Sequence, residues 1–493
     1  MTQELTIYFT SDVHGYFYPT DFSSNEERDL GLFKCCNQFT ADGNTLCLDG
    51  GDNLQGSPLA GYCHEVLQDA RPLANWMNRG KYNLLCLGNH DFNYGMAYQK
   101  EFVDALQADV TCVNLRDPRG KQPYPERIVS LENGLRIGVV GLVTDSVPVW
   151  EKEENLAGYQ ITDAVAEARQ ALARLQGKVD LTIGIYHGGF ERDLTTGEVL
   201  SQSKENRAFE LAHDVNFDIL LTGHQHMHVE GRDLFGTFVV QPDCNAREFV
   251  RLHVTWEEGQ KHISSRHCSA KGVPAACHDP DLDRIYREAQ AWLDEELGHL
   301  PAPLLVSSHL DMALHGSPLA DFYNQIQRAY TGAQLSATSL ANEVRGIPQL
   351  VHRRDLLIAY PYSNTLVKIE VTGAILRQAM ERSASYFDLD DRGHPTISDR
   401  FLKPKVEHYN YDYYAGVEYS LDLNQPLGHR IRDLKVEGQP VHDRDHFTMC
   451  LNSYRASGTG GYAFYRDCPV LSAYGKEIGE LLVEFFEEQG GCN

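Results

Sequence analysis

The sequence predicts a protein of the α/β class, in which helices cover buried β-sheets. Eight short apolar runs rich in Val, Ile and Leu recur in residues 1–270, and a polar cluster directly follows each run. Segments with the helical spacing of apolar residues lie between these runs. The composition, with 42% apolar and 23% charged residues, is typical of a globular protein rather than a disordered one.

The eight apolar runs are the predicted strands of the first part of the chain. Their short length and their Val, Ile and Leu content favour strands that are buried within a sheet. Between two of them, the segment ITDAVAEARQALARLQG places Val165, Ala168, Leu172 and Leu175 at helical spacing. The predicted strands are LTIYFTS, NTLCLDGGD, YNLLCLGNHD, DVTCVNL, RIGVVGLV, VDLTIGIYHGG, FDILLTGHQH and TFVVQPD.

A charged segment divides the chain into two predicted domains. At 493 residues the chain exceeds the size at which one hydrophobic core keeps growing, so two domains are expected. The segment DPDLDRIYREAQAWLDEELGHL has the pattern of one charged helix, and Pro301 and Pro303 would end it. We therefore expect a first domain over residues 1–275, a linker helix over residues 276–303 and a second domain over residues 304–493.

The second domain is predicted to mix helices with strands. The segments HGSPLADFYNQIQRAY and GAILRQAMERS have helical patterns, and Thr372 is placed to cap the second of them. LVKIEV, which lies between them, has the pattern of a strand. In KEIGELLVEFFEE, four apolar residues share one helical face and are expected to pack in the core, namely Ile478, Leu481, Leu482 and Phe485.

Charge and cysteine content limit the partners and the location of the protein. The formal net charge of -25 argues against a nucleic-acid polymer as partner, since such binding needs clustered Lys and Arg. The twelve cysteines have no regular spacing, which suits a reducing compartment. The sequence has no apolar stretch of membrane-spanning length and no leader pattern at its start. We expect a cytoplasmic protein without a membrane partner.

Five of the predicted strands end in side chains that bind metal ions. Such groups converge at one edge of a sheet when they lie on loops that leave parallel strands. Each motif alone is better explained by a turn or a structural histidine, but the ordered set argues against that explanation. Seven ligands exceed the need of one ion and suit two divalent cations about 3.5 to 4 Å apart that share a carboxylate. The candidate ligands are Asp12, His14, Asp52, Asn89, His187, His224 and His226.

The motifs D-x-H, G-D, G-N-H-[DE], H and G-H-x-H, in this order, resemble the signature of the metallophosphoesterases. The second half of the chain resembles the second domain of the 5′-nucleotidase and 2′,3′-cyclic-nucleotide 2′-phosphodiesterase family, through YPYSNTLVKIEVTGAILRQAMERS and NSYRASGTGGY. The resemblance covers nearly the whole chain. It implies a four-layer α/β/β/α metallophosphoesterase domain followed by an α/β nucleotide-binding domain, with an active site between the two and a rotation of one domain against the other.

The resemblance also implies how such a site works. Phosphate oxygens would bind both cations, and a metal-bound hydroxide would attack phosphorus in line. Mixed oxygen and nitrogen ligation suits Mn²⁺ or Zn²⁺, with Fe or Co²⁺ as alternatives. His90 would stabilise charge on the phosphoryl or leaving oxygen as a hydrogen-bond donor or general acid. Asp12, His14 and His226 would hold one cation, Asn89, His187 and His224 the other, and Asp52 would bridge them.

One position departs from the 5′-nucleotidase branch of the family. There an Asp at the end of the GNH[ED]FD motif supports the histidine, whereas this sequence has Asn93. GNHDFNYG is instead similar to the GNHEFNYG of the 2′,3′-cyclic-nucleotide branch. An amide orients an imidazole but does not compensate its positive charge. Both Asn93 and Asp91 therefore remain candidates for the residue that supports His90, and Asp91 is a candidate catalytic group.

The resemblance also suggests where a nucleobase would bind. Members of the family clamp the base between two aromatic rings of the second domain, and Tyr454 in NSYRASGTGGY takes the place of one ring. Tyr411 is the candidate for the other ring, with Tyr413 or Tyr414 as alternatives. Arg345 lies where the family often has an arginine that binds substrate, although a surface role is equally compatible with the sequence.

These expectations define the predicted function. We expect a dimetal nucleotide phosphohydrolase that acts on 2′,3′-cyclic nucleotides and 3′-nucleotides first, and on 5′-nucleotides or UDP-sugars second. One rival is a phosphoesterase for an ester without a base. Another is a non-catalytic nucleotide-binding protein, against which the complete set of candidate ligands argues. The oligomeric state is left open by the sequence.

Overall fold

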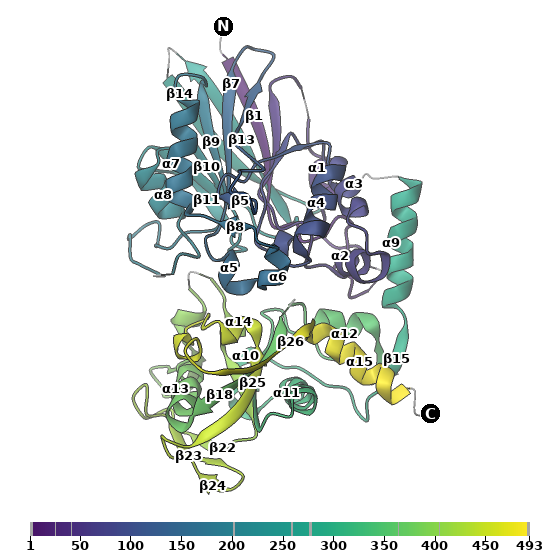
Figure 1. The fold of residues 1–493 in the computed structure, drawn as a ribbon, viewed down its shortest axis with the longest axis vertical. Helices are drawn as coiled ribbons and strands as arrows, with labels where there is room; N and C mark the ends of the chain where they lie inside the picture. Colours follow the sequence, from purple (N-terminus) through teal and green to yellow (C-terminus); the bar gives the residue numbers. More distant parts are fainter. Residues whose placement is uncertain are drawn as a thin grey trace. The chain divides into compact units, whose positions relative to one another are not determined.

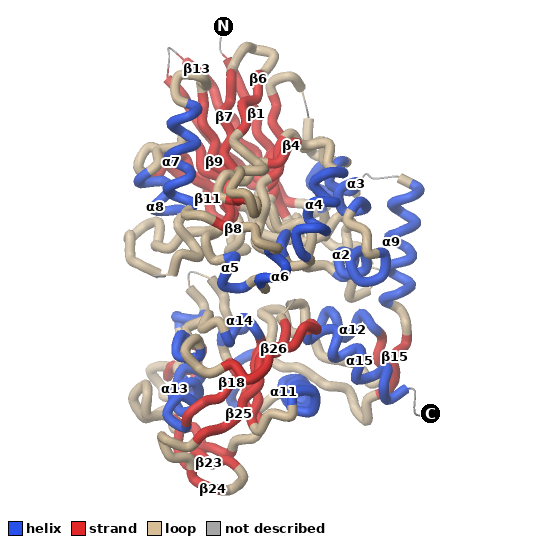
Figure 2. Tube along the Cα trace, in the orientation of Figure 1, coloured by secondary structure: helices blue, strands red, loops and turns tan. Residues whose placement is uncertain are grey.

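The computed structural model describes residues 3–24, 26–40, 42–200, 203–257, 260–275, 279–362, 364–403 and 405–490. The chain forms two compact units, Met1–Gln290 and Ala291–Asn493, and each has its own sheets and cores (Figures 1 and 2). Among the described residues, no helix has both the length and the apolar character that crossing a membrane requires.

The first unit contains two six-stranded sheets. The first has the order β14-β13-β1-β2-β3-β4 and the second the order β11-β12-β10-β9-β7-β6. Each of the eight predicted runs contains one of these strands. The strands of the first sheet are β1 (Gln3–Thr10), β2 (Thr45–Asp49), β3 (Leu84–Leu85), β4 (Asp109–Val110), β13 (Glu248–Glu257) and β14 (Gln260–Ser269). Those of the second are β6 (Arg127–Ser130), β7 (Arg136–Val143), β9 (Leu181–His187), β10 (Ile219–Thr222), β11 (Val229–Leu234) and β12 (Thr237–Gln241).

The two sheets pack face to face, and helices cover their outer sides. Side chains from both sheets, such as Ile7, Leu48, Val139 and Ile183, form one buried core. Figure 1 shows α7 and α8 on one side of the sheets and α1, α3 and α4 on the other, which gives the four layers expected. The helices are α1 (Leu32–Cys36), α2 (Pro58–Tyr62), α3 (Arg71–Asn78), α4 (Gly95–Ala105), α5 (Val147–Trp150), α6 (Glu153–Leu156), α7 (Ala164–Leu175) and α8 (Ala208–Asp214). A small antiparallel pair joins β5 (Leu115–Arg116) and β8 (Gln160–Ile161).

The parallel strands of both sheets end in register. In the first sheet Thr10 pairs with Asp49, and Asp49 pairs with Leu85. In the second sheet Tyr186 pairs with Thr222. Because these are the last or next-to-last residues of their strands, the loops that follow leave the sheets at a common edge. This register brings together motifs that are far apart in the sequence.

The linker differs from the predicted single helix. Helix α9 (Pro280–Leu293) contains the boundary between the two units, but it ends seven residues before residue 300. Residues Glu296–His299 form strand β15, which pairs antiparallel with β17 (Leu350–His352). Strand pairing prevails here because Gly298 adopts a φ of 153° and Leu297 is buried in the core of the second unit. Residues 276–278 of the predicted linker lie outside the described residues.

The second unit is built on a five-stranded sheet of order β21-β16-β25-β18-β26. As predicted, Thr372 caps a helix, and its side chain accepts a hydrogen bond from the backbone N–H of Ile375. The sheet strands are β16 (Leu335–Ser339), β18 (Thr365–Thr372), β21 (Asp412–Ala415), β25 (His446–Asn452) and β26 (Val470–Glu477). The helices are α10 (His309–His315), α11 (Pro318–Thr331), α12 (Arg353–Ala359), α13 (Gly373–Ala384), α14 (Ser453–Ala456) and α15 (Ile478–Gly490). Smaller sheets contain β19 (Phe387–Leu389), β20 (Pro395–Ile397), β22 (Glu418–Leu421), β23 (Ile431–Val436) and β24 (Gln439–Pro440).

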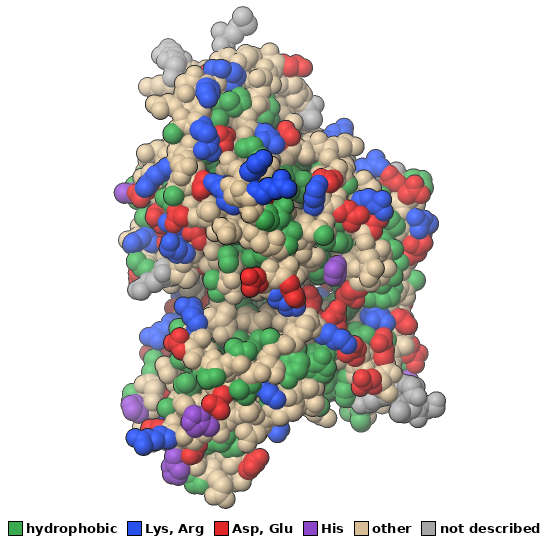
Figure 3. Space-filling model, viewed as in Figure 1, with side chains coloured by type: hydrophobic (Ala, Val, Ile, Leu, Met, Phe, Trp, Pro, Cys, Tyr) green, Lys and Arg blue, Asp and Glu red, His purple; other side chains and the backbone are tan. Residues whose placement is uncertain are grey.

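The surface of the first unit carries charges of both signs. On the face drawn in Figure 3, lysine and arginine side chains are interspersed with acidic ones. The chain as a whole has 44 basic and 69 acidic residues, which produces the net charge of -25. A phosphate group bound by such a protein needs a local source of positive charge.

Candidate dimetal centre

The predicted ligands meet at the edge where the parallel strands end. Two groups of three side chains have ligand atoms that all lie within 4.8 Å of one another inside each group. Asp12 and His14 leave β1, and Asp52 follows β2. His187 is the last residue of β9, and the loop after β10 supplies the remaining histidines. The first group is Asp12, His14 and His226, and the second is Asp52, His187 and His224.

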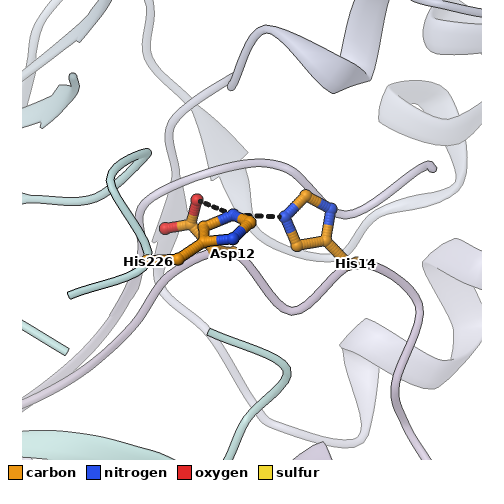
Figure 4. A group of neighbouring side chains, drawn as sticks. All are labelled: Asp12, His14 and His226. Carbon is orange, nitrogen blue, oxygen red and sulfur yellow. Dashed lines mark hydrogen bonds and ion pairs between the residues drawn. The ribbon is translucent and has the colours of Figure 1, made fainter. Parts of the chain in front are cut away.

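In the first group, His226 lies between the other two side chains (Figure 4). Its Nε2 is 2.9 Å from Nε2 of His14 and 3.4 Å from Oδ1 of Asp12. Asp12 and His14 are almost fully buried, whereas the side chain of His226 is 37% exposed, so solvent reaches this end of the site at His226. Three side-chain donors that converge in this way match the ligand set of one divalent cation.

Asp52, a member of the second group, also lies close to the first. Its Oδ2 is 3.0 Å from Nε2 of His187, in the second group, and 3.9 Å from Nε2 of His14, in the first. Its Oδ1 accepts a hydrogen bond of 2.7 Å from the backbone N–H of His90. A carboxylate in this position can bridge two cations.

Backbone carbonyls hold the ring orientations of two histidines. Nδ1 of His14 is 2.8 Å from the carbonyl oxygen of Gln55, and Nδ1 of His187 is 2.7 Å from that of Gly50. A carbonyl only accepts, so each Nδ1 carries a proton, and in the neutral ring Nε2 presents a lone pair to the cluster. Second partners that orient metal-binding histidines in this way are a general feature of metal sites.

Three buried atoms of the predicted ligands have no hydrogen-bond partner among the described residues. They are Oδ2 of Asp52, Oδ1 of Asn89 and Nε2 of His187. Asp52 Oδ2 and His187 Nε2 are close enough to bond but are not aligned for a hydrogen bond. Burying such atoms without a partner is costly, and bound cations would supply the missing partners. The residues present therefore fit a metal centre.

A third group of possible ligands serves as a contrast. His228, Glu248 and His267 also lie close together. Here both ring nitrogens of each histidine have a hydrogen-bond partner. The partner of Nδ1 is Glu248 in both histidines. No atom of this group is left for a cation to satisfy, so the structure explains it as a hydrogen-bonded cluster.

The backbone at the centre is strained. Five of the seven predicted ligands adopt a left-handed conformation, with φ between 52° and 70°. This conformation costs residues other than glycine roughly 1 to 2 kcal/mol each, so the surrounding contacts must hold it in place. These residues are Asp12, His14, Asp52, His224 and His226.

Two motif glycines leave room for the carboxylates. A Cβ atom on Gly88 would lie 2.1 Å from Oδ1 of Asp52, and one on Gly223 would lie 2.6 Å from Oδ2 of Asp12. Contacts this short are repulsive, so any side chain at these positions would displace a ligand. The glycines of GNHD and GHQH are thus required by the packing of the ligands.

The electrostatics of the cluster favour bound positive charge. Burial raises the pKa of Asp52, but the charges of His187 and His90 outweigh it and hold that pKa well below its usual value. Burial lowers the pKa of His187, but the carboxylates of Asp52 and Asp12 outweigh it and raise that pKa to about 9. Without cations, imidazole protons therefore compensate the carboxylates. Divalent cations would take over this role and release those protons.

Asn93, not Asp91, contacts the ring of His90. Nδ1 of His90 is 2.7 Å from Oδ1 of Asn93. The carboxylate of Asp91 instead accepts backbone N–H groups of Gly88, Asp52, Asn53 and Leu54, at 2.8 to 3.0 Å. The prediction of Asp91 as a catalytic group is corrected on this point, because its oxygens are occupied in holding the Asp52 loop.

Several residues at the centre were not predicted from the sequence. Oε1 of Glu205 is 3.1 Å from Nε2 of His224, and the ring of Trp150 stacks on His224 with centroids 5.6 Å apart. Glu151 accepts a hydrogen bond from Nδ2 of Asn93. These residues lie in segments without apolar periodicity or a ligand-like motif, so no signal in the sequence distinguished them.

In the second unit, Tyr409 rather than Tyr411 lies beside Tyr454. The rings of Tyr409 and Tyr454 have centroids 6.4 Å apart, and both residues are half-buried. Tyr411 is only 7% exposed, packs with Tyr386 and Phe387, and donates its hydroxyl to the carbonyl of Ala313. A ring this buried has no face for a base, so the prediction of Tyr411 is corrected.

The alternative rings and Arg345 occupy different environments. Tyr413 packs against Tyr411, with centroids 4.9 Å apart, and the hydroxyl of Tyr414 bonds with Ser383. Arg345 is exposed on the segment between β16 and β17. Its contact with substrate stays a prediction.

A buried arginine positions the two rings of the second unit. Arg455 is 1% exposed, and its guanidinium bonds the carboxylate of Asp412 at 2.8 and 2.9 Å. The same group donates to the carbonyl of Tyr409 at 2.9 Å. Arg455 directly follows Tyr454, so one side chain ties the two ring-bearing segments together. Replacing such a buried charge leaves its partner unpaired.

Fold and site together define a class of protein. Two packed sheets with ligands at the ends of their parallel strands are the architecture of a calcineurin-like phosphoesterase. The family described as calcineurin-like phosphoesterase matches residues 5–228 of this chain. Residues 297–467 match the family described as the 5′-nucleotidase C-terminal domain. The chain belongs to the 5′-nucleotidase family of metallophosphoesterases, which is a family of phosphoric ester hydrolases that use divalent metals.

Individual relatives cover nearly the whole chain. A Staphylococcus aureus protein provisionally assigned as a 5′-nucleotidase, solved with alpha-ketoglutarate, is 31% identical with a TM-score of 0.90, over 98% of this chain and 96% of its own. A 2′,3′-cyclic-nucleotide 2′-phosphodiesterase/3′-nucleotidase of Haemophilus influenzae is 24% identical over 99% of this chain and 86% of its own length. The trifunctional nucleotide phosphoesterase YfkN of Bacillus subtilis is 23% identical over 99% of this chain, which spans 38% of that longer protein.

Proposed function

We propose that this chain hydrolyses phosphate esters of nucleotides, with 2′,3′-cyclic nucleotides and 3′-nucleotides as its first substrates. The observation that carries the proposal is the shared carboxylate of Asp52 between two ligand groups, with unpartnered atoms around it. A site of this kind is suited to a phosphate group, because it concentrates positive charge once its cations are present.

In the proposed reaction, different residues of the first unit bind the cations and contact the phosphate group. When bound, two divalent cations, which we propose to be Mn²⁺ or Zn²⁺, supply positive charge for phosphate oxygens and lower the pKa of water. Asn93 accepts from Nδ1 of His90, so Nε2 is the atom of that ring left to meet the substrate. We assign Nε2 of His90 to donate to the phosphoryl or leaving oxygen. Asp12, His14 and His226 would hold one cation, Asn89, His187 and His224 the other, and Asp52 both.

The proposed substrate class is supported by the relatives and by Asn93. Three relatives named 2′,3′-cyclic-nucleotide 2′-phosphodiesterase/3′-nucleotidase are each 24% identical over 93–99% of the chain. The motif GNHDFNYG, with Asn93 bonded to His90, also resembles that branch. Tyr409 and Tyr454 offer rings on which a base of any identity would stack.

A second candidate is the hydrolysis of 5′-nucleotides or UDP-sugars. The Staphylococcus aureus relative provisionally assigned as a 5′-nucleotidase favours it, since its identity of 31% is higher than that of the cyclic phosphodiesterases. Both candidates use the same ligand set, so substrate preference distinguishes them and metal binding does not.

Phosphate release from a panel of esters tests the proposal. The panel contains 2′,3′-cyclic AMP coupled to an added phosphatase, 3′-AMP, 5′-AMP and UDP-glucose, each with Mn²⁺, with Zn²⁺ and with a chelator. We expect turnover that requires metal, is fastest for the first two compounds and is lost in Asp52→Ala. A higher kcat/KM for 5′-AMP would favour the second candidate. Full turnover by Asp52→Ala would contradict the proposal, and no turnover by the wild type would indicate a non-catalytic protein.

We also propose that the protein acts in the cytoplasm. All ten cysteines among the described residues are free thiols, as expected in a reducing compartment. Comparing the protein in soluble, membrane and secreted fractions of its native cells tests this, and recovery outside the cytoplasm would contradict it.

A further inference from the structure

A carboxylate lies directly behind the pair formed by His90 and Asn93. Oδ1 of Asn93 faces Nδ1 of His90 at 2.7 Å, and Nδ2 of Asn93 donates to Oε1 of Glu151. The other oxygen of Glu151 accepts from Nδ2 of Asn155 at 2.9 Å, and that same Nδ2 donates to the backbone carbonyl of Asn93 at 2.7 Å. The four side chains thus form one hydrogen-bonded chain that begins at the ring of His90.

The direction of this chain follows from what each group can donate. An ionised carboxylate only accepts, so the amide nitrogen of Asn93 must face Glu151. The amide oxygen must then face His90, and Nδ1 of His90 must carry a proton. Glu151 therefore determines both the orientation of the Asn93 amide and the tautomer of His90. If the partner of Asn93 could both donate and accept, the amide oxygen and nitrogen could exchange places, and the tautomer of His90 would not be determined.

Glu151 is also placed to act on His90 electrostatically. The residue is half-buried, and burial raises its pKa above the usual value, although hydrogen bonds from Asn155 and Asn93 and the charge of His90 oppose that rise. The carboxylate of Glu151 bonds the amide of Asn93 that faces His90, and hydrogen bonds to charged groups are stronger than those between neutral ones. Asn93 polarises between them, which transmits the effect along the chain.

The segment that carries Glu151 is anchored at the metal centre. Glu151 directly follows α5, whose last residue, Trp150, stacks on His224. Asn155 lies in α6, the next helix. The position of Glu151 is therefore tied both to a predicted metal ligand and to His90.

We propose that Glu151 is a positioning residue that acts on His90 through Asn93. Glu151 supplies, through the side chain of Asn93, the negative charge that an aspartate at position 93 would supply directly. This inference rests on the proposed function, since it assigns to His90 a part in phosphate-ester hydrolysis.

A double-mutant cycle separates this role from a structural one. The variants are Glu151→Gln, Asn93→Asp and the double variant, measured with the nucleotide that the wild type turns over fastest. Glu151→Gln keeps the shape and an acceptor but removes the charge, and we expect kcat to fall about 10- to 100-fold with little change in KM, the range expected for a charge-assisted hydrogen bond. Asn93→Asp is also expected to be slow, because two carboxylates then meet.

The double variant is the decisive member of the cycle. In it the carboxylate introduced at position 93 faces His90 directly, and the amide introduced at position 151 donates to that carboxylate, so we expect kcat to exceed that of either single variant. Glu154→Gln, an exposed neighbour with the same loss of charge, serves as the matched control and is expected to keep the wild-type kcat. Metal content and circular dichroism are measured for every variant to exclude loss of the fold.

Two results would overturn the inference. One is a Glu151→Gln kcat within twofold of the wild type. The other is a double variant that is as slow as the two single variants combined, which indicates a structural role. Failure of the proposed function is distinguishable, because the wild type would then turn over no nucleotide. In that event the cycle is run on bis(4-nitrophenyl) phosphate, and absence of turnover there as well would overturn the inference too.

Discussion

Glu205 illustrates how much of the centre depends on residues that do not belong to any motif. Its carboxylate meets Nε2 of His224 at 3.1 Å, which leaves Nδ1 of that ring for a cation. Partners of this kind orient a ligand and raise its basicity. Asp12, Asp52 and His187 could be predicted because they follow apolar runs, whereas Glu205 lies in a polar stretch where nothing marks it.

Replacing Glu205 by Gln tests this role at the residue scale. We expect the affinity for Mn²⁺ to fall about 10- to 100-fold, the usual cost of losing such a partner, because His224 loses its orienting carboxylate. Calorimetric titration of the metal-free protein with Mn²⁺ measures it. Glu210→Gln is a suitable control, since that carboxylate pairs with Arg207 instead. An unchanged affinity for Mn²⁺ in Glu205→Gln would show that Glu205 does not orient His224 for metal binding.

A single methyl group at Gly88 should have a large effect. The added Cβ would lie 2.1 Å from Oδ1 of Asp52, and either the loop or the ligand must move. Displacing a reacting group by about 1 Å costs on the order of 100-fold in rate. We therefore expect kcat/KM of Gly88→Ala to fall by about 100-fold or more. An added Cβ at Gly475 meets no atom within 4 Å, so Gly475→Ala is expected to keep the wild-type kcat/KM. Equal activity of the two variants would show that the Asp52 loop tolerates displacement.

At the scale of the element, the sequence predicted strands well and irregular segments poorly. The eight apolar runs became strands because burial on both faces of a sheet demands their composition. The linker was predicted as one helix, but residues Glu296–His299 pair with β17, a partner about 50 residues away that local pattern does not reveal. Tyr411 was predicted and Tyr409 was not considered for the same reason, since the burial of Tyr411 depends on distant residues such as Tyr386 and Ala313.

A short helical turn in the second unit should respond to acid. Residues His408–Asn410 form a 3₁₀-helix that carries Tyr409, and the ring of His408 stacks on His309 with centroids 3.9 Å apart. Burial and the charge of His309 lower the pKa of His408 from 6.5 to about 4. Between pH 6.5 and about 4 the unfolded chain binds more protons at His408 than the folded chain does. The contribution of neutral His408 to the free energy of unfolding is therefore complete above pH 6.5 and is lost as pH falls through 4.

Thermal unfolding at a series of pH values measures this effect. We expect the midpoint of the wild type to fall more between pH 7.5 and 4.5 than that of His408→Gln, whose side chain does not titrate. The difference between the two midpoints should therefore change with pH. A constant difference over this range would show that His408 is protonated equally in both states.

At the scale of the whole molecule, the two units have separate tasks in the proposed function. The ligands and His90 belong to the first unit, and the paired rings of Tyr409 and Tyr454 belong to the second. Stacking on an aromatic ring contributes about 1 to 3 kcal/mol per base. The second unit should therefore set affinity for the base while the first sets the rate of hydrolysis.

Tyr409→Ala tests this division. We expect KM for 3′-AMP to rise about 5- to 100-fold, the equivalent of losing one stacked ring, with a small change in kcat. Hydrolysis of glycerol 2-phosphate, which has no ring, should be unaffected. Tyr330→Ala, which removes a ring that is 42% exposed elsewhere in the second unit, is the matched control. Equal loss on both substrates would mean that Tyr409 does not contact the base.

Anomalous diffraction from crystals of the Mn²⁺-loaded protein tests most directly whether two cations share the Asp52 carboxylate. We expect two anomalous peaks about 3.5 to 4 Å apart, with the Asp52 carboxylate between them and histidine ligands beside each peak. A single peak, a peak only at His228, Glu248 and His267, or no peak at saturating Mn²⁺ would contradict it.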